Sequence, residues 1–191
     1  MAVAKALGAS RIIAVDIVES RLEFAKEYAA TDTFLPPPPN AGESKLEYSK
    51  RSATLMKEQL GIQERGPTAI DLVVDASGAE VSIQTALAVV KSGGTHVQVG
   101  MGNPAVTIDM GTVLPKEIVL KGSFRYGHGD YALGIALVSQ GKLNLSKLIT
   151  HRYVFEDAKI AFKATQAGKG ADGKGIIKAM ISGPGVSTDV I

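Results

Sequence analysis

An acidic residue that closes a short apolar run is the first position at which the sequence suggests chemistry. Asp16 directly follows the run 12–15, and Arg21 lies in the first turn of a helix predicted from about residue 19. In dinucleotide-binding βαβ units, such a carboxylate accepts hydrogen bonds from the adenosine ribose hydroxyls. It would also repel an additional 2′-phosphate, so the pattern favours NAD over NADP. Two alternatives stay open: Asp16 caps the helix that follows, and Arg21 is a solvated surface residue.

The acid that binds the ribose normally follows a Gly-rich phosphate turn by about 20 residues. Counting back that distance from Asp16 passes Met1, so we expect the first strand and its glycine loop to lie upstream of this sequence. Residues 1–7 are then the last part of the helix that follows this loop, and Gly8 ends that helix.

Two turns of small residues follow later predicted strands, DASG at 75–78 and VGMG at 99–102. Ligands of open α/β sheets bind beyond the carboxyl ends of the strands, where small residues let a ribose or an adenine approach the backbone. The alternative for the first turn is an ordinary strand-to-helix connection capped by Ser77. Together with Asp16, the two turns in series favour a nucleotide site.

A further strand end carries side chains that can donate hydrogen bonds. The segment SFRY at 123–126 places Arg125 and Tyr126 where they could bind a hydroxylated substrate or the phosphates of a cofactor. The alternative is an exposed pair of side chains on an edge strand.

Strand-like and helix-like segments alternate, which predicts an α/β fold of parallel strands joined by crossover helices. Helices are expected at 1–7, 19–29, 43–60, 79–90, 129–141 and 155–167. Strands are expected at 11–16, near the start of 31–42, within 69–78, within 93–102, and at 117–124, 151–155 and 176–182. The apolar run from Ile70 to Val74 suits a strand buried on both faces. Four prolines at 36–39 exclude a helix or a central strand there.

The composition is that of an ordinary globular protein, with 191 residues, 45% hydrophobic and 21% charged residues and a net charge of +2. Basic residues are scattered, so no nucleic-acid partner is expected. No apolar run is long enough for a membrane span and no signal peptide is evident, so we expect a cytoplasmic protein. The sequence has no cysteine, and His96, His128 and His151 lack metal-ligand spacing, so no metal site is predicted.

Five segments together resemble the medium-chain dehydrogenase/reductase superfamily, and within it the zinc-dependent polyol branch that includes xylitol and sorbitol dehydrogenases. The segments are RIIAVDIVESRLEFAKEYAAT, DLVVDASGAE, GGTHVQVGMG, LKGSFRYGHGDYALGIALV and KLITHRYVFEDAKIAFK. The stretch GSFRYGHGDY at 122–131 is the part typical of the polyol branch. The long, Pro-rich link at 34–66 departs from the shorter spacing of that family.

The resemblance implies a Rossmann-like doubly wound parallel sheet that lacks its first strand and Gly-rich loop. It divides the chain into a truncated dinucleotide-binding domain at 1–150 and a C-terminal segment at 151–191. This segment would return to an upstream catalytic domain, which in the family binds the zinc through Cys, His and Glu. A homo-oligomer, either a dimer or a tetramer, would form through the edge strand 117–124.

The resemblance also implies NAD as the cofactor and a polyol as the substrate of a reversible hydride transfer. The ribose and adenosine contacts would be Asp16 and Arg21. The segment beside the nicotinamide ribose would be Val99, Gly100 and Met101, and the next cofactor-contacting segment Ser123, Phe124 and Arg125. The residues facing the polyol would be Arg125 and Tyr126.

Because the zinc-binding half would lie outside this sequence, we expect the chain by itself to be inactive and to bind NAD weakly. One alternative is a non-catalytic nucleotide-binding or dimerisation domain. Another is an S-adenosylmethionine-dependent methyltransferase, which also uses an acid after its second strand. The paired turns VGMG and GSFRYG argue against the methyltransferase.

Overall fold

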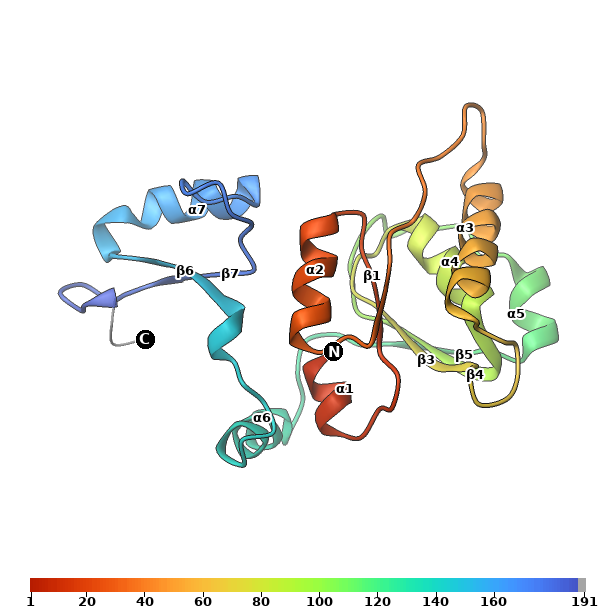
Figure 1. Cartoon of the computed structure of the whole chain (residues 1–191), viewed down its shortest axis with the longest axis horizontal. Coiled ribbons are helices and arrows are strands. Elements are labelled where there is room, and N and C mark those ends of the chain that lie inside the picture. The colour runs from red at the N-terminus through yellow and green to blue at the C-terminus, as the bar shows by residue number, and fades with distance from the viewer. Residues whose placement is uncertain (189–191) are drawn as a thin grey trace. The chain divides into compact units, whose positions relative to one another are not determined.

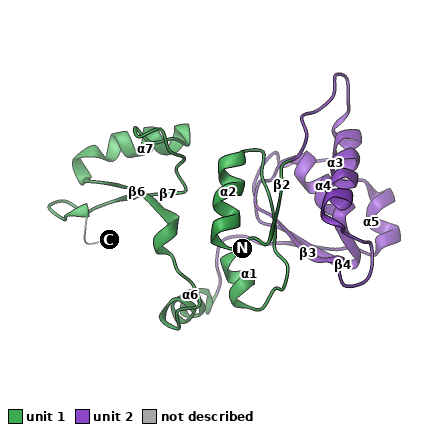
Figure 2. Ribbon diagram, viewed as in Figure 1, with its two compact units in different colours: residues 1–35, 128–191 green, residues 36–127 purple. Residues whose placement is uncertain are grey.

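The computed structural model describes residues 1–188, in which helices and strands alternate along the chain (Figure 1). The chain forms two compact units, one made of residues 36–127 and the other of residues 1–35 with 128–191 (Figure 2). All pairs of named strands in the described residues are parallel. The α/β class and the parallel strands predicted from the sequence are therefore confirmed.

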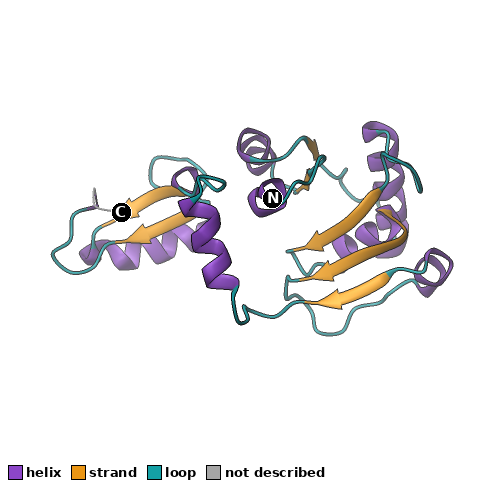
Figure 3. Cartoon of the chain, turned by 90° about the horizontal axis from the view of Figure 1, so that it is seen from below, coloured by secondary structure: helices purple, strands orange, loops and turns teal. Residues whose placement is uncertain are grey.

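The unit 36–127 is built on a three-stranded parallel sheet in the order β3-β4-β5 (Figure 3). The strands are β3 (Ile70–Asp75), β4 (Val90–Gln98) and β5 (Val119–Gly122). The helices of this unit are α3 (Lys45–Leu60), α4 (Glu80–Val89) and α5 (Met110–Lys116). Parallel strands all end at one edge of the sheet, so the turns after β3 and β4 become neighbours.

The core of this unit lies between the sheet and helices α4 and α5. Ile83 and Leu87 are one helical turn apart on α4, so both side chains point the same way. They pack with Val90, Val113 and Ile118. Burying a side chain of this size contributes roughly 1.5–3 kcal/mol, and the cluster therefore fixes both helices to the sheet.

The expectation that β3 is buried on both faces is wrong. Val73 packs against the core cluster, but Leu72 is 53% exposed and Val74 is 55% exposed. Side chains alternate between the two faces of a strand, and the core cluster of this unit covers only the face that carries Val73. An apolar run in the sequence cannot distinguish one covered face from two.

Helix α3 begins and ends as its sequence dictates. Ser44 and Glu47 form a capping box, in which the Ser44 hydroxyl accepts from the Glu47 N–H and the Glu47 carboxylate accepts from the Ser44 N–H. The helix stops at Gly61, whose φ of 62° is left-handed. The Ser49 hydroxyl donates to the carbonyl of Val81 at 3.0 Å, which ties α3 to α4.

The Pro-rich segment 36–39 is fastened to α3 by one arginine. The Arg51 guanidinium donates two hydrogen bonds of 2.7 Å to the Glu43 carboxylate and one of 3.0 Å to the carbonyl of Pro38. This bidentate geometry orders a stretch whose prolines exclude it from helix and from strand interior.

The described residues of the other unit form two separate two-stranded parallel ladders. The first comprises β1 (Ile13–Val15) and β2 (Asp32–Phe34), with helices α1 (Ala2–Ala6) and α2 (Glu19–Tyr28). Leu22 and Ala25 of α2 pack against Ala14 of β1. Arg11 pairs with Asp32 across the ladder at 3.1 Å.

The second ladder pairs β6 (Ile149–Tyr153) with β7 (Lys178–Ile181), and helix α7 (Ala158–Ala167) joins them. Helix α6 (Asp130–Ser139) precedes it, and short 3-10 turns cover Ser146–Leu148 and Phe155–Asp157. The two C-terminal strands expected from the sequence therefore pair with each other. The assignment of 151–191 to a separate domain stays a prediction. No described helix is both long and apolar enough to cross a membrane.

Candidate functional site

The turns that follow β3 and β4 are packed backbone against backbone. A Cβ atom on Gly102 would lie 2.1 Å from the carbonyl oxygen of Gly78, and one on Gly100 would lie 2.4 Å from the Gly78 nitrogen. Gly78 itself has a φ of 71°, which disfavours a side chain. These glycines, which the sequence suggested would admit a ligand, bring the two turns into direct contact.

Asp75, the last residue of β3, connects both turns. Its Oδ1 accepts from the N–H groups of Ser77 at 3.0 Å and Gly78 at 2.7 Å, in the first turn. Its backbone carbonyl accepts from the N–H groups of Val99 and Gly100, both at 2.9 Å, in the second. Asp75 is only 4% exposed, so these bonds form away from solvent.

Gln98, at the end of β4, makes a second link. Its Nε2 donates to Asp75 Oδ1 at 3.1 Å and to the carbonyl of Gly100 at 2.8 Å. Its Oε1 lies 3.0 Å from Nε2 of His96, a ring that is 2% exposed. Polar groups therefore run in a continuous chain from His96 through Gln98 to Asp75.

The electrostatics keep the Asp75 carboxylate charged. Burial alone would raise its pKa, because a low-dielectric interior disfavours the ion. Hydrogen bonds to the carboxylate more than offset this, and the pKa lies below the usual range for an aspartate. The donors are Ser82, Gly78, Gln98 and Ser77. Because all of these donors belong to the protein itself, the Asp75 carboxylate acts as a structural anion.

The predicted nicotinamide-side residues lie beyond these links. Val99 is 44% exposed and Met101 is 82% exposed, whereas Gly100 between them is held at both its N–H and its carbonyl. The arrangement presents a fixed backbone with two accessible side chains at the carboxyl edge of the sheet.

The neighbouring strand brings the second predicted segment to the same edge. The N–H of Ser123 donates to the carbonyl of Gln98 at 2.9 Å, continuing the pairing of β4 with β5. Phe124 and Tyr126 are exposed, and the Arg125 guanidinium lies 5.0 Å from the centre of the Phe124 ring. Arg125 has a φ of 60°, an uncommon left-handed conformation for a residue other than glycine.

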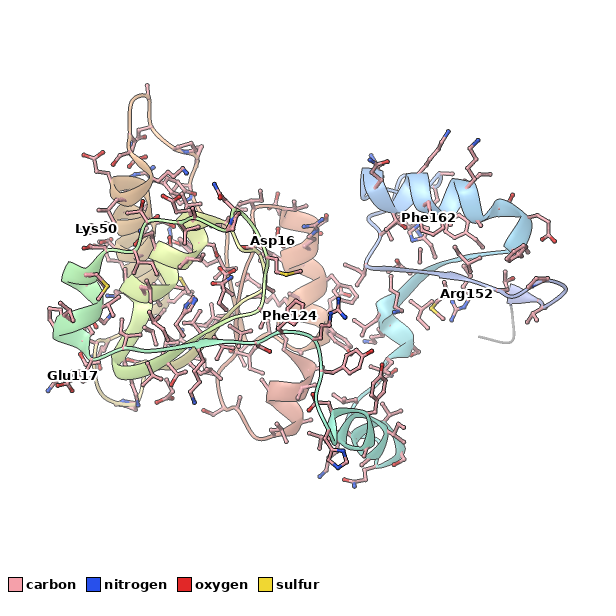
Figure 4. All side chains as sticks on the ribbon, turned by 180° about the vertical axis from the view of Figure 1, so that it is seen from behind. Asp16, Lys50, Glu117, Phe124, Arg152 and Phe162 are labelled. Carbon is pink, nitrogen blue, oxygen red and sulfur yellow. The ribbon has the colours of Figure 1, made fainter. Side chains whose placement is uncertain are left out.

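Asp16 and Arg21 lie together at the carboxyl end of β1, in the other unit; Figure 4 labels Asp16. Asp16 Oδ1 accepts from the N–H of Val18 at 2.9 Å, and Oδ2 lies 3.7 Å from Arg21. This bond closes a local turn before the helix: α2 has Val18 as its N-cap and no side-chain cap, so the alternative that Asp16 caps the helix is wrong. The side chain of Asp16 is still 31% exposed, so a ribose contact remains a prediction.

Within residues 1–188, no three His, Cys, Asp or Glu side chains are grouped so that they could hold a metal ion. The described residues therefore do not fit a catalytic zinc. A shallow surface hollow between α2 and β2 contains none of the predicted site residues. Its lining residues are Glu19, Leu22, Glu23, Lys26, Thr33 and Leu35.

Sequence reasoning missed the roles of Asp75 and Gln98. The available signals were an acid at the end of an apolar run and two polar residues, His96 and Gln98, spaced for the same face of one strand. Neither signal shows that the two residues meet, because the bond from Gln98 to Asp75 joins residues 23 positions apart in the sequence.

Parallel α/β folds with glycine turns at the carboxyl ends of their strands are typical of nucleotide-binding domains. Two solved structures agree with this fold. L-idonate 5-dehydrogenase from Escherichia coli has a TM-score of 0.71 at 26% identity, over 95% of this chain and 45% of that one. An alcohol dehydrogenase from E. coli CFT073, complexed with NADH, has a TM-score of 0.75 at 20% identity, over 95% and 48%.

Residues 1–140 match the zinc-binding dehydrogenase family, and the chain belongs to that family. Probable D-xylulose reductase A from Aspergillus niger is 48% identical over 182 residues. This match covers 95% of the chain and 46% of the relative, so the chain spans about half the length of the curated relatives it matches. The resemblance to medium-chain polyol dehydrogenases and the Rossmann-like fold class are confirmed.

Proposed function

We propose that this chain is the NAD-binding part of a polyol dehydrogenase that oxidises a secondary alcohol, as in the conversion of xylitol to D-xylulose. The carboxyl edge of the β3-β4-β5 sheet carries this proposal, because it places the segments at 99–101 and 123–126 side by side on a rigid base. The 48% identity to D-xylulose reductase A supports the substrate class.

Asp16 is proposed to accept hydrogen bonds from the adenosine ribose, with Arg21 beside the adenosine. The exposed part of the carboxylate leaves acceptor positions free of the Val18 N–H. A 2′-phosphate at this position would meet a like charge, so the preferred cofactor is NAD rather than NADP.

The backbone of Val99, Gly100 and Met101 is proposed to line the nicotinamide ribose. The next segment, Ser123, Phe124 and Arg125, would contact the cofactor as well, and Arg125 with Tyr126 would face the polyol. Hydroxyl groups on a polyol accept hydrogen bonds from a guanidinium, and they can both donate to and accept from the hydroxyl of a phenol. The side chains of Arg125 and Tyr126 suit these contacts.

Bound NAD supplies a hydride acceptor. The residues of this chain would orient that acceptor and part of the substrate. We expect no xylitol oxidation by the 191-residue chain. Zinc-dependent reduction of NAD by purified chain with xylitol would contradict this expectation.

Cofactor binding is the direct test of the proposal. The purified chain would be titrated with NADH and with NADPH, followed by the fluorescence of the reduced nicotinamide, up to millimolar concentrations. We expect NADH to bind about tenfold more tightly than NADPH, since one unfavourable charge contact is of that size. Asp16→Ser should narrow this ratio, whereas Glu19→Gln, a change of a nearby exposed acid, should leave it unchanged. Equal affinities in the unaltered chain would reject the NAD preference.

A second candidate function is assembly, because β5 is the edge strand of the three-stranded sheet in the described residues. Val119 and Leu120 on this strand are 44% and 45% exposed, and an uncovered strand edge is a template for pairing. We propose a homo-oligomer formed through residues 117–124. Sedimentation of the chain should show a dimer or tetramer, and Val119→Lys should shift it toward the monomer. A monomer at all concentrations would reject this candidate.

A cytosolic location is also proposed. The sequence has no cysteine, so its fold needs no oxidising compartment. Microscopy of the tagged protein in its own cells would test this.

A further inference from the structure

The hydrogen bonds of Asp75 are divided between two loops that are far apart in the sequence. Its carboxylate organises the turn after β3, through Ser77 and Gly78. Its carbonyl organises the turn after β4, through Val99 and Gly100. One buried residue therefore sets the position of the second turn relative to the first.

Gly100 is held on both sides. Its N–H donates to the Asp75 carbonyl at 2.9 Å, and its carbonyl accepts from Gln98 Nε2 at 2.8 Å. The same Gln98 amide also donates to the Asp75 carboxylate. A change of the Asp75 side chain therefore removes the partner that orients Gln98 toward the Gly100 carbonyl, whereas the backbone bond from the Gly100 N–H to the Asp75 carbonyl is kept.

The glycine contacts leave little room for the second turn to move. The Gly78 backbone would meet a Cβ on Gly100 or Gly102 at less than 2.5 Å. The Asp75 carboxylate acts on this turn through Gly78, which packs against Gly100 and Gly102, and through the Gln98 amide. Without the carboxylate, both lose the acceptor that positions them against the second turn, where Val99 and Met101 are exposed. A shift of this turn would therefore first affect the binding of a ligand at residues 99–101.

We propose that Asp75 is a positioning residue for the cofactor: it never touches the dinucleotide, but it fixes the turn 99–102 and thereby sets the affinity for the nicotinamide half. This inference rests on the proposed function, in which 99–101 line the nicotinamide ribose. The adenosine half, proposed to contact Asp16 in the other unit, is expected to be independent of Asp75.

The test compares two ligands on the same 191-residue chain. NADH reports on the whole cofactor, and AMP reports on the adenosine half alone, with both dissociation constants measured by calorimetry. Asp75→Ala should weaken the binding of NADH about tenfold or more, because several buried hydrogen bonds are lost. It should leave the dissociation constant of AMP within about twofold of the unaltered value. The NADH affinity of Asp75→Asn should lie between those of the unaltered chain and of Asp75→Ala, because the Asn amide oxygen can still accept from the N–H of Gly78.

Two further variants keep the result interpretable. Asp71→Ala is the matched control: Asp71 is on the same strand, and its exposed carboxylate pairs with Lys91 instead of with the turns. Gln98→Met frees the Gly100 carbonyl while leaving the Asp75 side chain in place, and should also weaken NADH alone. If Asp75→Ala does not fold, Gln98→Met alone still tests the inference.

Each outcome decides something. Loss of NADH affinity with unchanged AMP affinity in the Asp75 and Gln98 variants supports the inference. Unchanged NADH affinity, or an equal loss for NADH and AMP, overturns it while leaving the proposed function intact. If the unaltered chain binds AMP and NADH with equal affinity, the proposed role of 99–101 fails, and the inference fails with it. Binding of neither ligand rejects the proposed function as a whole.

Discussion

Two carboxylates of this chain are kept ionised by different means. Asp75 is buried, which alone would raise its pKa, but backbone and side-chain donors lower it. Glu43 is fixed by Arg51, whose hydrogen bonds are the main cause that lowers the pKa of Glu43 to about 2. The first carboxylate joins two turns at the candidate site, and the second orders a Pro-rich loop.

The Glu43 pair predicts a specific pH dependence. Because the pKa of Glu43 is lowered from 4.5 to about 2, its stabilising contribution is present above pH 4.5 and is lost as the pH falls toward 2. Carboxyl NMR should place the Glu43 midpoint near pH 2, and Arg51→Met should return it toward 4.5. Arg65→Met removes the same charge from an exposed position and should not move it. A midpoint near 4.5 in the unaltered chain would contradict the prediction.

The glycine contact predicts a steric effect at one residue. Gly102→Ala places a Cβ 2.1 Å from the Gly78 carbonyl oxygen, so the turns must separate. We expect a loss of about 2 kcal/mol in the free energy of unfolding, measured with urea. Gly122→Ala is the control, since nothing lies within 4 Å of its added Cβ. Equal stabilities of the two variants would show that the turns are not in contact.

At the scale of elements, the alternating pattern was sufficient to predict most helices and strands. Helix α5 was missed because it is short and contains Gly111 and Pro115, both poor helix formers. It forms because the Asp109 carboxylate caps it and Val113 is buried in the core. The cap is a local signal that the sequence carries in Asp109, whereas the burial of Val113 is a tertiary effect that local propensity does not describe.

The candidate site was predictable only in part. The turns at 75–78 and 99–102 were placed correctly at strand ends, because strand periodicity and glycines are local signals. The hydrogen-bond network through Asp75 and Gln98 was not predicted, because a bond between residues 23 positions apart depends on the order of the strands in the sheet. The roles of Asp16, Arg21 and residues 123–126 in binding stay predictions.

The one-sided burial of β3 makes adjacent residues behave differently. Val73→Ala removes two methyl groups packed against the core cluster and should cost about 1.5 kcal/mol of stability. Leu72→Ala, on the exposed face, should cost less than about 0.5 kcal/mol. Urea unfolding of both variants measures the difference. A larger loss for Leu72→Ala would mean that this face is covered in solution.

At the scale of the whole molecule, the two units differ in how their strands are supported. Strand β4 pairs on both sides, with β3 and β5, whereas in the part of the chain that the structure describes each of the other two ladders has two strands. Two-stranded ladders are marginally stable without additional packing, so stability is expected to be uneven along the chain.

Hydrogen exchange measures this unevenness directly. We expect the slowest amides of the described chain in β4, within 95–98, where a central strand adjoins the buried cluster. Amides of β1 and of β7 should exchange faster under the same conditions. Protection in either two-stranded ladder that equals that of β4 would contradict this order.

The division of the chain also sets an order of events during synthesis. Residues 36–127 are continuous, but the unit around them is assembled from 1–35 and 128–191. Since a ribosome releases the chain from its N-terminus, the inner unit can complete its sheet while the segment from residue 128 onward is still being translated. Residues 1–35 are synthesised before this inner unit, whereas residues 128–191, which belong to the same unit as 1–35, follow it, so the outer unit can be completed only after the inner one has been made.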